Sequence, residues 1–151
     1  MAHDPARDSS LEVLGKVAEL AAQIGLVGRL EEDTRRFFLG VDLGQGRLQG
    51  VYVRDSSHAG RPTVTVFSPG LQMEKAAFQA LLPRLALDLL RANETMTLAR
   101  YGLVENDRYA LVMASVDHLL DSFAPADLQA SVFAVAQAAD RCEREFGRDD
   151  Y

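Results

Sequence analysis

The stretch RFFLGVDLGQGRLQGVYVR, residues 36–54, decides the fold because its apolar residues alternate with a period of two on both sides of a glycine-containing turn. In an extended chain, alternate side chains point to opposite faces. A turn centred on Gln45 and Gly46 would bring the two apolar sides together as an antiparallel hairpin. The expected cross-strand pairs are Leu43 with Leu48, Val41 with Gly50 and Leu39 with Tyr52.

This predicted hairpin has apolar residues on both of its sides. The expected core side carries Phe37, Leu39, Val41, Leu48 and Tyr52. The opposite side carries Phe38, Val51 and Val53. A second apolar face is covered by a helix or by a partner subunit, or it remains open to bind an apolar segment of a partner. We therefore name Phe38, Val51 and Val53 as candidate partner-binding residues.

Three segments around the hairpin have helical periodicity. The first begins at Ser9, because Ser9 and Glu12 form a capping-box pattern, and ends near Gly25. The second covers residues 72–93, where we expect Pro83 to kink or break the helix. The third begins at Pro125 and ends at Gly147. Its apolar stripe contains Leu128, Val132, Val135, Ala139, Cys142 and Phe146.

Three further segments have the pattern of strands. Residues 61–70, RPTVTVFSPG, form a β-branched strand that Ser-Pro-Gly is expected to end. Residues 95–103 and 108–116 flank Asn106-Asp107 and predict a second hairpin. The order is helix, three strands, helix, two strands and helix. This order predicts an α+β fold in which the helices pack on a five-stranded antiparallel sheet.

Length, charge and hydropathy limit the organisation and the class of function. The 151 residues suit one domain, over residues 9–147, with residues 1–8 disordered and residues 148–151 a charged tail. The net charge of −6 opposes binding to nucleic acid or to an anionic membrane. No run of 18 apolar residues occurs, and residues 1–10 do not resemble a secretory signal. We therefore expect a cytoplasmic protein.

No residue pattern indicates catalysis, and we expect neither an enzyme nor a bound cofactor. Ser115, Asp117 and His118 lie close in sequence but lack the context of a nucleophile elbow. The histidines lack zinc-ligand spacing with each other or with Cys142, so no metal is expected. Cys142 lies in the apolar stripe of the last helix, which favours a buried structural thiol.

One motif leaves an alternative function open. Asp42, Gly44 and Gly46 resemble the first phosphate hairpin of the actin and sugar-kinase fold, in which small residues let backbone amides face phosphate. That fold needs two lobes and a second glycine-rich loop, which this sequence does not show. A glycine-containing turn is the favoured interpretation, and a small nucleotide-binding protein or enzyme is the alternative.

The second half of the chain resembles a known family. The similar segments are LLRANETMTLARYGLVENDRYALVMASV (89–116), DHLLDSFAPADLQ (117–129) and AVAQAADRCEREFG (134–147). Leu89-Leu90 with Asn93 matches the family's corner between helix and strand, and Tyr101-Gly102-Leu103 matches the run that opens its second hairpin. These segments resemble the YbjN-type family of bacterial proteins, which shares the fold of class I type III secretion chaperones.

The resemblance implies a nonenzymatic, acidic, cytoplasmic protein that forms a homodimer. The chaperone relatives hold an unfolded segment of a secreted protein, so the implied partners are a second copy of this chain and an unfolded segment of a secreted or regulatory protein. Because relatives commonly dimerise near the second helix, the resemblance also implies a dimer interface at Leu82, Leu85 and Leu89. Pro83 and the short link after Asn93 depart from the family pattern at this place.

Overall fold

A computed structural model describes residues 5–147 as three helices packed on an antiparallel sheet of six strands. The helices are α1 (Pro5–Gln23), α2 (Lys75–Thr95) and α3 (Pro125–Phe146), with a short 3-10 turn at Leu120–Ser122. The strands are β1 (Gly28–Glu31), β2 (Arg36–Asp42), β3 (Leu48–Asp55), β4 (Thr63–Glu74), β5 (Arg100–Glu105) and β6 (Tyr109–Leu119). Their order across the sheet is β1-β2-β3-β4-β6-β5.

The α+β class and the order of the helices are as the sequence predicts, but the sheet has six strands rather than five. The additional strand is β1, which pairs with β2 at the edge of the sheet. Its four residues, GRLE, are exposed or half-buried, and their burial does not alternate along the strand. A short edge strand of this kind lacks the periodicity that identified the others.

The first helix begins earlier than predicted. It starts at Pro5, so Ser9 and Glu12 lie inside the helix and do not cap it. Residues 5–8 of the segment expected to be disordered are therefore helical, whereas residues 1–4 and the predicted tail 148–151 lie outside the described residues. The predicted end at Gly25 is confirmed. Gly25 has a φ of 70°, and the amide of Leu26 donates to the carbonyl of Ala21, as in a Schellman cap.

The register predicted for the first hairpin is wrong by one residue. The observed pairs include Asp42 with Leu48, Val41 with Gln49, Leu39 with Val51 and Phe38 with Tyr52. The connection is longer than a two-residue turn, because the amide of Leu43 donates to the carbonyl of Arg47 at 2.9 Å. Since side chains alternate between faces, a slip of one residue moves every side chain of one strand to the other face.

The second helix and the strand before it also differ from the sequence-based boundaries. β4 continues through the predicted stop and passes Pro69 to Gln72 with a register shift against β6, so the proline and glycine form a bulge instead of an end. α2 then begins at Lys75 and includes Pro83 without interruption, so the predicted break is wrong. The second hairpin is confirmed: the side chain of Asn106 accepts hydrogen bonds from the amides of Arg108 and Tyr109.

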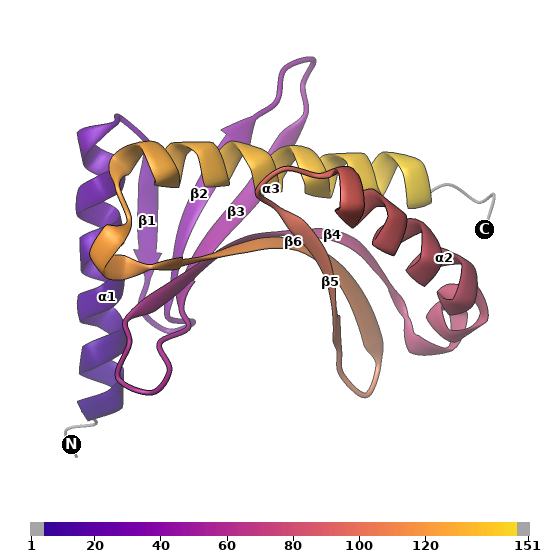
Figure 1. The fold of residues 1–151 in the computed structure, drawn as a ribbon, viewed down its shortest axis with the longest axis horizontal. Helices are drawn as coiled ribbons and strands as arrows, with labels where there is room; N and C mark the ends of the chain where they lie inside the picture. Colours follow the sequence, from indigo (N-terminus) through magenta and orange to yellow (C-terminus); the bar gives the residue numbers. More distant parts are fainter. Residues whose placement is uncertain (1–4, 148–151) are drawn as a thin grey trace.

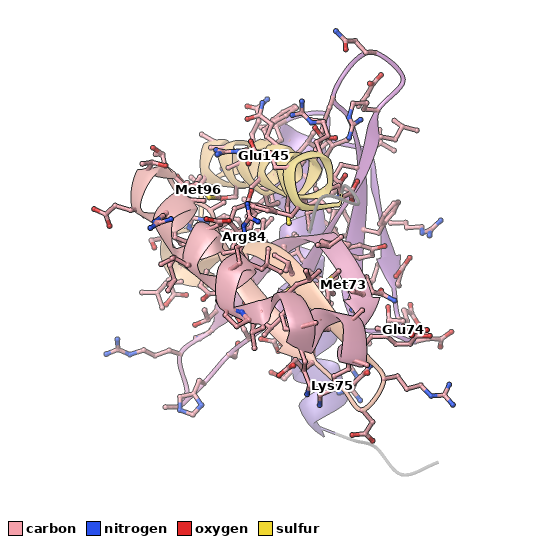
Figure 2. All side chains as sticks on the ribbon, turned by 90° about the vertical axis from the view of Figure 1, so that its right-hand side faces the viewer. Met73, Glu74, Lys75, Arg84, Met96 and Glu145 are labelled. Atoms are coloured by element: carbon pink, nitrogen blue, oxygen red, sulfur yellow. The ribbon has the colours of Figure 1, made fainter. Side chains whose placement is uncertain are left out.

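All three helices contribute side chains to one hydrophobic core on one face of the sheet. α3 runs across the sheet, α1 lies at the β1 end and α2 at the opposite end (Figure 1). Seen from that opposite end, α2 begins at Lys75 and ends just before Met96, which lies beside α3 (Figure 2). The whole predicted apolar stripe of α3 is buried, as expected. Within residues 5–147, no helix lies on the other face of the sheet.

Candidate binding face of the sheet

The helix-free face of the sheet, called here the open face, presents a row of aromatic side chains. Cross-strand pairing aligns Phe38 of β2 with Tyr52 of β3 and Tyr52 with Phe67 of β4. The ring centroids are 5.2 Å apart between Phe38 and Tyr52 and 5.5 Å apart between Tyr52 and Phe67. At these separations the rings are in contact with each other. We call Phe38, Tyr52 and Phe67 the aromatic row.

Arginine side chains lie over the aromatic row. The guanidinium carbon of Arg29 is 4.9 Å from the ring centroid of Phe38. Arg36 lies 5.8 Å from Tyr52 and 5.7 Å from Phe67, and Arg54 lies 5.4 Å from Phe67. Distances below about 6 Å are those of cation–π contacts. The row is therefore an apolar surface with guanidinium groups above it.

Part of the open face is buried without help from a helix. Phe67 is 6% exposed and Met113 is 7% exposed, yet both lie outside the hydrophobic core. Thr65, beside Phe67 along β4, is also buried and donates a hydrogen bond to Asp117 of β6. Neighbouring side chains on the sheet provide this burial, so side chains of the open face pack closely against one another.

The structure separates the three predicted partner-binding residues. Phe38 lies on the open face, as expected. Val51 and Val53 are fully buried in the core under the helices, so their expected placement beside Phe38 is wrong. The one-residue slip in register explains the difference, because it exchanges Val51 and Val53 with Tyr52.

The sequence indicates the open face by pairing an arginine with an aromatic residue on each of two strands, in opposite order. Arg36 and Phe38 are two residues apart on β2, and Tyr52 and Arg54 are two residues apart on β3. Residues two apart in a strand share a face, so this spacing places an arginine beside an aromatic ring on both strands. Our sequence interpretation assigned Tyr52 to the core and did not single out the arginines.

The predicted dimer residues lie on the inner side of α2. Leu85 is 2% exposed in the core, and Leu82 and Leu89 are half-buried against it. The expected role of Leu85 as a surface contact is therefore wrong. The outer side of α2 has its own apolar stripe at alternating steps of four and three residues. Its members are Ala76, Ala80, Pro83, Leu87 and Leu90, all exposed. We call these residues the outer stripe.

The glycine-containing loop between β2 and β3 is held by hydrogen bonds within the chain. Gly44, Gln45 and Gly46 all have positive φ, of 82°, 55° and 76°. The amide of Gly44 donates to the Asp42 carboxylate at 2.8 Å, so this carboxylate closes its own turn. Arg47 forms an ion pair with Asp140 of α3, whose carboxylate is nearly buried and also pairs with Arg144. This geometry favours the interpretation as a structural turn.

The residues considered for hydrolytic or metal chemistry do not come together. Ser115 and Asp117 lie on the open face, whereas His118 points to the other face, where its Nε2 is 2.7 Å from Oγ of Ser131. Ser131 is fully buried, and the ring of His118 stacks on Phe123. Among residues 5–147, no group of histidine, cysteine and acidic side chains could hold a metal ion.

Two buried groups near α3 have pKa values raised by burial. Burial raises the pKa of the Cys142 thiol to about 11, and a backbone hydrogen bond with Leu71 opposes this shift. Burial also raises the pKa of Tyr101 to about 12, and the hydroxyl of Tyr101 donates to the carbonyl of Ala138 at 2.7 Å. Both groups are thus protonated and structural at neutral pH, in agreement with the expectation for Cys142.

No family model matches the chain, and no curated protein matches it. Within the described residues, no helix has the length and apolar character needed to cross a membrane.

Proposed function

We propose that this protein is a nonenzymatic, chaperone-like interaction module of the cytoplasm that acts as a homodimer and holds a segment of another protein on the open face. The observation that carries the proposal is the aromatic row on a sheet face without a helix. Tyr52 and Phe38 remain half-exposed there, while every helix packs on the other side. Aromatic and arginine side chains are the residue types that are enriched at protein interfaces.

The outer stripe of α2 supports the homodimer. Leu87 is 48% exposed and Leu90 is 67% exposed, although the inner side of the same helix already fills the core. Alternating steps of four and three residues align apolar side chains along one side of a helix, as in the seam of a coiled coil. A second copy of α2 packed along the outer stripe would bury both leucines, and it would leave the open face of each protomer free.

Selection from a random displayed-peptide library tests segment binding without a known partner. The immobilised wild-type protein is expected to enrich peptides that do not bind Tyr52→Ser. A matched control, Gln137→Ser, changes an exposed residue of α3 and should retain these peptides. Circular dichroism checks that each variant is folded. If no peptide is enriched, or if the enriched peptides bind Tyr52→Ser as well as the wild type, segment binding at the open face is wrong.

A further inference from the structure

We propose that the open face recognises an acidic, extended segment of a partner protein, whose carboxylates pair with Arg36 and Arg54 while its apolar side chains lie on the aromatic row. This inference rests on the proposed function and adds the chemistry of the partner.

Arg36 and Arg54 are directly opposite each other across β2 and β3. Both side chains are exposed, and their guanidinium groups lie over the rings of Tyr52 and Phe67. Like charges at directly opposed positions of a sheet repel and lower stability. Within residues 5–147, neither guanidinium forms an ion pair that would relieve this repulsion. An anion between the two would relieve it.

The acidic side chains on the same rows already have partners. Glu31 lies directly opposite Arg36 across β1 and β2, but it accepts its hydrogen bonds from Arg29, at 2.9 and 3.2 Å. The pKa of Glu31 is lowered chiefly by this contact with Arg29, with a smaller effect from the charge of Arg36. Asp117 lies two strands from Arg54 with Thr65 between them, and it accepts its hydrogen bond from Thr65. Arg100 lies on β5, two strands beyond Phe67, and donates to backbone carbonyls. The open face thus retains positive charge at Arg36 and Arg54, although the chain as a whole has a net charge of −6.

The geometry favours a peptide over a single-stranded nucleic acid. Bases bind such platforms by stacking on free aromatic faces. Here Phe38 and Tyr52 are half-buried and Phe67 is only 6% exposed, so the row leaves ring surface for an apolar side chain but no run of open ring faces for successive bases. The negative net charge also repels a long polyanion. A short acidic segment is repelled less, because it carries few negative charges. Guanidinium groups bind carboxylates through paired hydrogen bonds, which suits aspartate or glutamate.

Fluorescence anisotropy with defined probes tests this chemistry on the full chain. The probes are a labelled peptide with aspartates on both sides of a central Phe-Leu pair, the same peptide with asparagine at each aspartate, and a labelled oligothymidylate. We expect the aspartate peptide to bind at least about tenfold more tightly than the asparagine peptide, because hydrogen bonds to charged groups are stronger than neutral ones. Added salt should reduce this difference.

The variant Arg36→Gln/Arg54→Gln should bind both peptides equally, whereas Arg108→Gln, at an exposed arginine of the β5–β6 turn, should behave as the wild type. Equal binding of the two peptides by the wild type, or unchanged discrimination by the double variant, overturns the inference. If the inference is overturned in this way but the library still yields peptides that bind the wild type and not Tyr52→Ser, the proposed function stands. Tighter binding of oligothymidylate than of the aspartate peptide overturns the inference in favour of a nucleic-acid site. A library that yields no peptide refutes the proposed function as well.

Discussion

Replacing Val53 by threonine tests which side of β3 faces the core. Val53 is fully buried, and its cross-strand neighbours are Phe37 and Val66, which are buried and apolar. Threonine has nearly the same volume as valine but brings a hydroxyl group. Burying a hydroxyl without a hydrogen-bond partner costs about 1–3 kcal/mol in protein mutants. We therefore expect Val53→Thr to lower the free energy of unfolding by about 2 kcal/mol.

Urea unfolding followed by far-ultraviolet circular dichroism measures this loss. With a urea dependence of about 2 kcal/mol per molar, a loss of about 2 kcal/mol lowers the midpoint by about 1 M. The matched control is Arg54→Thr at the next residue, whose side chain is exposed on the open face. Loss of its cation–π contact with Phe67 and relief of its repulsion with Arg36 oppose each other, so this replacement should change stability by less than about 0.5 kcal/mol. All proteins are compared at one concentration, because the proposed dimerisation would shift the midpoint. If Val53→Thr leaves the free energy of unfolding unchanged, or if Arg54→Thr lowers it more, the register in the structure is wrong and the register expected from sequence is favoured.

Three further outcomes follow from the packing of α2 and α3. Leu90→Asp should convert a dimer to monomers in sedimentation velocity, whereas Gln79→Asp on another exposed side of α2 should not. Gly70→Ala should cost about 1–3 kcal/mol in urea unfolding, because a new Cβ would lie 3.2 Å from both the Cys142 Cβ and the Val112 carbonyl oxygen; no loss would show that α3 can shift. The pKa of Cys142 rises from 9.0 to about 11 on folding, so the unfolded chain ionises first and stability should fall between pH 9 and pH 11. Cys142→Ala should reduce this fall in urea titrations, and an unchanged fall would contradict it.

The helices were predictable because their burial follows directly from local periodicity. The stripe of α3 repeats at steps of three and four residues from Leu128 to Phe146, and each of its members is buried. Proline and glycine mark its two ends, where Pro125 begins the helix and Gly147 follows it. Burial on a single helix face requires no knowledge of the partner element, so one segment of sequence contains the whole signal.

The register of the first hairpin was not predictable from the same kind of pattern. Both registers pair apolar residues with apolar residues, because Phe37 and Phe38, and likewise Val51 and Tyr52, are adjacent apolar positions. The choice is made by the loop, where Gln45 adopts a positive φ between two glycines. A non-glycine residue adopts that conformation infrequently, so a turn with Gln45 in it is difficult to infer from composition. The candidate site was misplaced for this one reason, since it depends entirely on which face each strand residue occupies.

The open face combines features that oppose each other in the free protein. Each exposed cation–π contact contributes about 0.5–1 kcal/mol, and this holds the guanidinium groups of Arg36 and Arg54 against the aromatic row. The same contacts keep two positive charges close together, which lowers stability. Arginines held by rings lose little further side-chain freedom when a carboxylate arrives, so less binding energy is spent on ordering them. The repulsion would also be relieved on binding. Both effects increase the affinity for an anionic segment, and neither increases the affinity for a neutral one. The repulsion that lowers the stability of the free protein would therefore contribute to selectivity for acidic partners.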